Sequence, residues 1–202
     1  MTPTTTLNRT VLVSPTRRRS ANRSSLLRLY LVRGVLAVVW AAAFAKAHAP
    51  LDALAIALLV AYPLIDAVSS LIDYRNMPRD AERRITAFNA VLSTLAAIAM
   101  GVAGTLGVAQ ALAVFGAWAV IAGAAQLVLG LRRRGRELGR QWPMLIAGGL
   151  SFLVGMSYVA RALGEQPSLA VLSVYATGGG VFFIIQAGLL AWRASQQRRA
   201  PH

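Results

Sequence analysis

Five polar side chains interrupt otherwise apolar segments, and they are the residues of this chain best suited to chemistry. They are Arg33, Asp66, Asn89, Gln126 and Gln186. A charged or amide group inside a membrane-crossing helix is costly unless it is paired or hydrated, so such groups often mark solute, ion or proton paths. The structural alternative is that they hold helices together through interhelical hydrogen bonds. Both interpretations require the five side chains to lie at a common depth.

The residues that enzyme catalysis or metal binding would need are scarce in this sequence. The chain has two histidines, seven acidic residues and no cysteine. No nucleophile stands beside a base, and no acidic residues pair in a pattern typical of catalysis. His48 lies four residues before Asp52 and could sense pH, although an ordinary loop histidine is the favoured interpretation. We therefore expect a non-enzymatic protein without a cofactor or a metal site.

A long uncharged segment sets the frame in which these side chains must be placed. The 47 residues from Ile85 to Leu131 contain no Lys, Arg, Asp or Glu. About 20 helical residues cross the hydrocarbon layer of a bilayer, so this segment is long enough for two crossings. The stretch from Leu106 to Gln110 contains a glycine and an amide, which predicts the bend between the two crossings.

The rest of the chain supplies four further apolar segments. With 56% hydrophobic and 14% charged residues, the composition is that of a membrane protein. Residues 1–26 are predicted to form a disordered, basic cytoplasmic tail, residues 27–193 a transmembrane domain, and residues 194–202 a second tail. The predicted spans are about 27–48, 51–73, 86–107, 109–131, 142–163 and 169–192.

The distribution of basic residues predicts which side of the membrane each loop occupies. With six spans, 19 of the 21 basic residues fall on the side that holds both termini, against Lys46 and Arg161 on the other. Lys and Arg are retained on the cytoplasmic side, so both termini are predicted to be cytoplasmic. Aromatic residues that favour the interface are expected at this inner boundary. They are Tyr30, Tyr74, Trp142 and Trp192.

The same topology predicts an ion pair between the first two spans. Arg33 and Asp66 lie on antiparallel helices, each roughly 7 to 10 Å below the cytoplasmic surface at 1.5 Å per residue. Pairing would let two individually poor spans insert together, and exchange of the two charges should then rescue either single mutant. Alternatively, Arg33 extends to the lipid headgroups and Asp66 is hydrated.

A threefold internal repeat is the third pattern in the sequence. Tyr62, Trp118 and Tyr175 fall in step in the even-numbered spans, spaced by 56 and 57 residues. Two helices return the chain to its starting side, so successive units have the same orientation. The predicted fold is all-α, with six transmembrane helices forming three parallel two-helix repeats in a pseudo-threefold bundle. Whether the three aromatic rings face the bundle axis or lipid is left open, and they are expected either to pack or to line a pore constriction.

The stretches RGVLAVVWAAAF, AYPLIDAVSSLI, FGAWAVIAGAAQLVLGLRRR and QWPMLIAGGLSFLVG carry a resemblance to a known family. Together they cover most of residues 33–192, and they resemble the HdeD-like acid-resistance membrane proteins. The resemblance implies a six-span protein of the bacterial cytoplasmic membrane, linked to acid stress and without catalytic residues to carry over. The arginine-rich leader departs from the pattern of this family. Ala67 departs from it as well, because the family tends to have glycine there.

Three functions follow as hypotheses. The first is a non-enzymatic, HdeD-like inner-membrane protein with a role in stress. The second is a small solute or ion transporter or channel that uses the Arg33 and Asp66 polar layer. The third is a membrane anchor whose arginine-rich face binds anionic lipid or an acidic partner. Homo-oligomerisation is left open, and nucleic-acid binding is not expected because the basic tail lacks interleaved aromatic residues.

Overall fold

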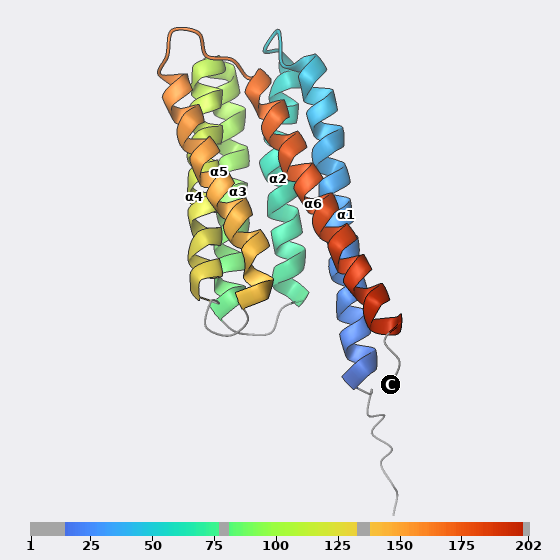
Figure 1. The fold of residues 1–202 in the computed structure, drawn as a ribbon. Helices are drawn as coiled ribbons and strands as arrows, with labels where there is room; N and C mark the ends of the chain where they lie inside the picture. The colour runs from blue at the N-terminus through green and yellow to red at the C-terminus, as the bar shows by residue number, and fades with distance from the viewer. Residues whose placement is uncertain (1–14, 77–80, 133–137, 200–202) are drawn as a thin grey trace, which may run out of the picture.

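The computed structural model describes residues 15–76, 81–132 and 138–199, and this part of the chain forms six α-helices (Figure 1). The helices are α1 (Pro15–Ala47), α2 (Ala53–Asn76), α3 (Ala81–Leu106), α4 (Val108–Arg132), α5 (Leu138–Ala162) and α6 (Ala170–Arg199). The predicted all-α fold is therefore confirmed for the described residues.

The first helix starts earlier than the sequence predicts. α1 begins at Pro15, so it takes in about half of the segment that was predicted to be a disordered tail. Proline is favoured in the first turn of a helix, and no glycine or proline follows it before the first apolar span. The predicted tail boundary at residue 26 is corrected accordingly, while residues 1–14 lie outside the described part of the chain.

All six helices are long and apolar enough to cross a membrane. The qualifying segments are Leu27–Ala47, Ala53–Arg75, Arg83–Leu106, Val108–Val128, Leu145–Ala162 and Ala170–Trp192. Large apolar side chains point outward along them, including Leu153 with 65% of its surface exposed and Val174 with 74%. An apolar exterior of this extent suits lipid rather than water. The chain is a multi-pass membrane protein with six spans, as predicted.

The bend inside the long uncharged segment is a single residue. Gly107 separates α3 from α4 and has a φ of +135°, a conformation that L side chains rarely adopt. Its amide donates to the carbonyl of Ala103, and its own carbonyl accepts from the amide of Ala111. The turn therefore completes the hydrogen bonding of both helix ends, at the position the sequence predicts.

The closest helix pairs are not the predicted hairpins. α4 packs extensively on α5, α1 on α6 and α2 on α3, whereas α1 with α2 and α5 with α6 make few contacts (Figure 1). Two of the closest pairs meet at glycines: a Cβ on Gly180 would lie 2.8 Å from the carbonyl oxygen of Gly34, and one on Gly148 would lie 2.9 Å from that of Gly123. Such small residues let helix backbones approach in lipid.

The two ends of the bundle differ. At one end α1, α3 and α5 begin and α2, α4 and α6 end, and we refer to it as the terminal end (Figure 1). The opposite half holds the densest apolar packing. Its fully buried side chains include Phe44, Leu59, Met100, Leu112, Phe115 and Leu172.

The four predicted interface aromatics all belong to the terminal half. Trp142 and Trp192 are more than half exposed. Tyr30 stacks on Phe183 with ring centroids 6.0 Å apart, and Tyr74 lies under the guanidinium of Arg83 at 4.2 Å. Their role as membrane-interface anchors stays a prediction.

Candidate functional site

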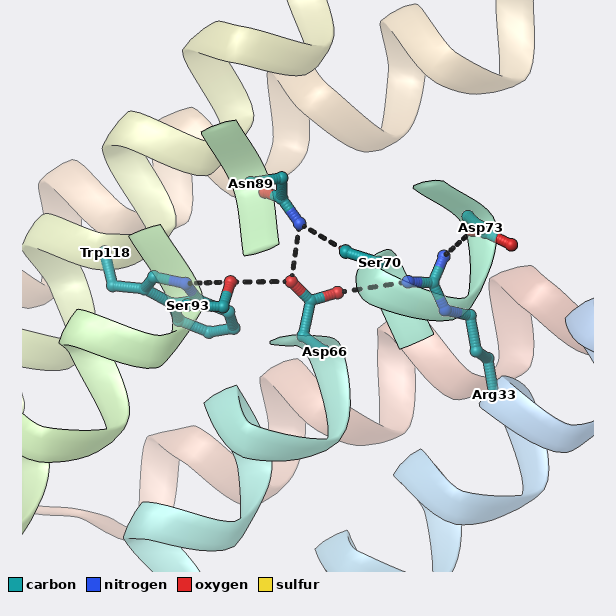
Figure 2. A network of polar contacts seen from close by, with 7 residues as sticks. All are labelled: Arg33, Asp66, Ser70, Asp73, Asn89, Ser93 and Trp118. Carbon is teal, nitrogen blue, oxygen red and sulfur yellow. Dashed lines mark hydrogen bonds and ion pairs between the residues drawn. The ribbon is translucent and has the colours of Figure 1, made fainter. Parts of the chain in front are cut away.

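The polar site is centred on the carboxylate of Asp66 in α2 (Figure 2). Asn89 Nδ2 and Ser93 Oγ of α3 donate to Asp66 Oδ2 at 2.7 and 2.8 Å, and Asn89 Nδ2 also donates to Ser70 Oγ at 2.9 Å. Asp66 and Ser70 are four residues apart on α2, as are Asn89 and Ser93 on α3, so each pair lies on one helix face. Two short polar ladders therefore meet across the α2 and α3 interface.

Arg33 of α1 completes the cluster from the other side. Its Nη2 lies 3.4 Å from Asp66 Oδ1, and its Nη1 lies 3.9 Å from Asp73 Oδ2. The predicted ion pair is present. Asp73 is two turns beyond Asp66 on the same face of α2 and was predicted only as the end of a span. Because one guanidinium faces two carboxylates, the three side chains carry a formal net charge of −1 when all are ionised.

The network continues into α4 through a buried hydroxyl. Trp118 Nε1 donates to Ser93 Oγ at 3.1 Å, and Ser93 is fully buried (Figure 2). Arg33, Asp66, Ser93 and Trp118 thus link four helices in sequence. Since an unsatisfied polar group in hydrocarbon is expensive, this connected set fixes how α1 to α4 sit against each other.

A cavity of about 340 Å³ opens beside Asp66. Its wall comes from α1, α2, α4, α5 and α6 and extends across the middle of the bundle, from Gln126 on the terminal side to Val174 on the opposite side. The polar side chains that line it are those of Arg33, Asp66, Ser69, Gln126 and Ser151. The aromatic side chains that line it are those of Tyr62, Trp118, Tyr158, Tyr175, Phe182 and Phe183. A volume of this size lies at the lower end of the range for small-ligand sites.

Not all five predicted polar residues meet. Arg33, Asp66 and Asn89 are in the network, and Gln126 lines the cavity without an assigned bond to Asp66. Gln186 is absent from the described cavity wall, although it lies on α6 at the terminal half. Helix depth could be estimated from the sequence, but the face of α6 that turns inward could not.

The three repeat-related aromatics converge inside the bundle. The ring centroid of Tyr62 lies 5.9 Å from that of Trp118 and 6.4 Å from that of Tyr175. Ser151 Oγ donates to the carbonyl of Ala119 and lies 2.7 Å from the hydroxyl of Tyr175, which therefore acts as the donor to Ser151. The rings form the end of the cavity that faces the apolar core. The sequence left open whether these rings face the bundle axis or lipid, and in the structure they both pack against the core and line the cavity.

The two other sequence candidates have local roles. His48 Nδ1 is 3.0 and 3.2 Å from the carbonyl oxygens of Ala45 and Phe44, at the end of α1. Asp52 Oδ1 accepts from the amide of Ala55, which makes it the N-cap of α2. Within the described ranges, no group of three His, Asp or Glu side chains gathers as a metal ion would need.

Comparison with known proteins gives one match. Residues 90–160 match a short-repeat family. Its description reads "Short repeat of unknown function (DUF308)", and the matched region runs from α3 through α4 to nearly the end of α5. No curated protein and no solved structure matches the chain. The matched segment contains Ser93, Trp118 and Ser151 but not Arg33 or Asp66.

Proposed function

We propose that this chain is a non-enzymatic protein of the bacterial cytoplasmic membrane that moves a small charged solute through the cavity beside Asp66. The observation that supports the proposal is the exposure of this carboxylate: 31% of the Asp66 side chain is exposed, on the wall of a cavity inside the bundle. A solely structural ion pair at membrane depth would be shielded from hydrocarbon by its partners. An acid left open at membrane depth is characteristic of solute and proton pathways.

The proposed orientation has both termini in the cytoplasm. The basic residues of the described helices concentrate toward the terminal end, and Asp66 and Gln126 on the cavity wall lie in the same half of the bundle. Under this orientation, solute reaches Asp66 from the cytoplasmic side. The dense packing of Phe44, Leu59 and Phe115 closes the other side, so transport would require that packing to open.

The proposed arrangement is a pseudo-threefold bundle of three repeats. Ala67, Gly123 and Gly180 follow the aromatic triad by five residues, and each is buried in a closely packed helix face. The preceding positions are Asp66, Ala122 and Gly179, and all three line the cavity. A cavity on the repeat axis would collect these equivalent positions. Of these three residues only Asp66 carries a charge, so the solute-binding role is assigned to the first repeat.

The proposal is tested by solid-supported membrane electrophysiology on proteoliposomes. Protons, alkali cations, organic cations and organic anions are offered in turn, and we expect current with at least one class. Gly178→Phe should abolish it, because Gly178 lines the cavity and has open space around its Cβ position, so the ring fills the cavity without disturbing helix packing. Asp52→Asn should leave it unchanged, since asparagine is an equally good N-cap outside the cavity.

Absence of current with every solute class, from folded protein, would contradict the transport proposal. The stress-related role would then be favoured. It is supported by the short-repeat match, because the HdeD-like proteins that the sequence resembles belong to that family. A deletion strain that survives poorly at low pH and is rescued by Gly178→Phe would indicate a role that does not need the cavity.

A further inference from the structure

We infer that the cavity selects a small organic cation with an apolar body, such as a quaternary ammonium or a protonated aromatic amine. The inference rests on the proposed function and names the class of solute that the site would accept. Three independent features of the cavity lead to it: the charge that is accessible, the chemistry of the walls and the position of the mouth.

The accessible charge is negative. Asp66 is more exposed than Arg33, with 31% of its side chain exposed against 19%. Arg33 is held between Asp66 and Asp73 and also lies 5.9 Å from the ring centroid of Phe183. Asp66 Oδ2 is occupied by two donors, whereas among the described residues Oδ1 has only the long 3.4 Å contact to Arg33. A cationic ligand can therefore approach Oδ1, while an anion would meet the carboxylate before the guanidinium.

The walls around that carboxylate are aromatic. Tyr62, Trp118, Tyr175 and Phe182 come from three helices and line the same cavity. The faces of aromatic rings carry partial negative charge and attract cations, most strongly those that shed water readily, such as quaternary ammonium groups. Inorganic cations keep their hydration shell and favour sites with several charged oxygen ligands, whereas Asp66 is the one carboxylate among the described residues of this wall. The lining therefore favours an organic cation.

The position of the cavity mouth is the reason for expecting a cation with an apolar part. Leu150 of α5 and Val174 of α6 line the cavity and are also 57% and 74% exposed on the outside of the bundle. α5 and α6 follow each other in the chain but make few contacts, and both contribute exposed residues to the cavity wall. An opening between them faces the lipid rather than only the cytoplasm. A cation with an apolar part partitions at that boundary and can enter sideways.

The test is calorimetric titration of three matched probes into the full-length protein in nanodiscs of neutral phosphatidylcholine, with empty nanodiscs subtracted. The probes are benzyltrimethylammonium, its uncharged isostere neopentylbenzene, and benzenesulfonate. We expect saturable binding of the cation and binding at least about tenfold weaker for the other two. Asp66→Asn should weaken cation binding by about tenfold or more and leave neopentylbenzene unchanged. Asp52→Asn should change neither.

Phe182→Leu provides a second variant that keeps the charge cluster intact. It should weaken cation binding about threefold or more. The affinity for neopentylbenzene should fall only as far as the lost contact area accounts for. Equal cation affinity in wild type, Asp66→Asn and Phe182→Leu would overturn the inference, as would tighter binding of benzenesulfonate. Current carried by protons or alkali cations in proteoliposomes, with no benzyltrimethylammonium binding, would refute the cation class but leave the transport proposal standing.

Discussion

Replacing Asp66 by leucine is expected to lower the free energy of unfolding by about 3 kcal/mol, because breaking one side of a partly buried ionic network leaves its partners unpaired. Asn89, Ser93 and Arg33 all lose Asp66 as an acceptor in this variant, while Asn89 keeps Ser70 and Arg33 keeps Asp73. Thermal unfolding in detergent, followed by loss of monodisperse protein, measures the change. Asp52→Asn is the control for loss of an acid elsewhere and should remain within about 0.5 kcal/mol of wild type.

A double-mutant cycle separates pairing from packing at this site. Arg33→Leu combined with Asp66→Leu should be less stable than Asp66→Leu alone, because Arg33 still pairs with Asp73 in the single variant and Asp73 loses that cation in the double one. Exchange of the two charges was predicted from sequence to rescue each single mutant. The structure predicts only partial rescue, because an arginine at position 66 cannot accept from Asn89 and Ser93. Wild-type stability of Asp66→Leu would contradict the network's structural role.

Gly148→Val is expected to destabilise the protein by about 3 kcal/mol or more, and Gly149→Val by far less. A Cβ on Gly148 would lie 2.9 Å from the carbonyl oxygen of Gly123 and 3.1 Å from the amide nitrogen of Leu127, both on the backbone of α4. A Cβ on Gly149 would meet only a Leu127 methyl at 3.9 Å. Overpacking against backbone forces the helices apart, which is costly where close approach drives association.

The matched pair makes this prediction specific to helix contact. The two glycines are adjacent on one helix, so valine's lower helix propensity affects both variants similarly. Each variant is compared with wild type by thermal unfolding in the same detergent. Equal losses in the two variants would show that α4 and α5 do not meet through Gly148, and the helix pairing described for this bundle would then be wrong.

Much of the fold follows from patterns that the membrane enforces. The uncharged run from Ile85 to Leu131 predicted two spans because backbone groups in lipid must form helices. Gly107 marked the turn because few residues accept its backbone conformation. The pairing of the helices could not be predicted in this way. Chain order suggested that consecutive helices pair as hairpins, whereas the packing depends on which helix faces carry small residues. The glycines at 34, 123, 148 and 180 carry that information, but only once their opposing partners are known.

The site was predicted in part for a similar reason. Depth along antiparallel helices was enough to bring Arg33 and Asp66 together, because the rise per residue is fixed. Ser93 was not among the predicted polar residues, because its hydrogen bonds depend on the rotation of α3. Asp73 and Ser70 were missed, although their spacing of seven and four residues from Asp66 puts them on its face of α2. A search for polar residues at helical spacing from Asp66 would have identified both Ser70 and Asp73.

The central claim is that a water-accessible cavity with Asp66 on its wall lies inside a lipid-facing bundle, and cysteine labelling tests it most directly. The chain has no native cysteine, so single cysteines report without background. Gly178→Cys lies on the cavity wall, whereas Leu153→Cys lies on the outer face of α5 with 65% of the native side chain exposed. In inside-out vesicles, a membrane-impermeant charged thiosulfonate should label Gly178→Cys and leave Leu153→Cys unmodified. Labelling of Leu153→Cys, or protection of Gly178→Cys from the reagent on the cytoplasmic side, would contradict the account.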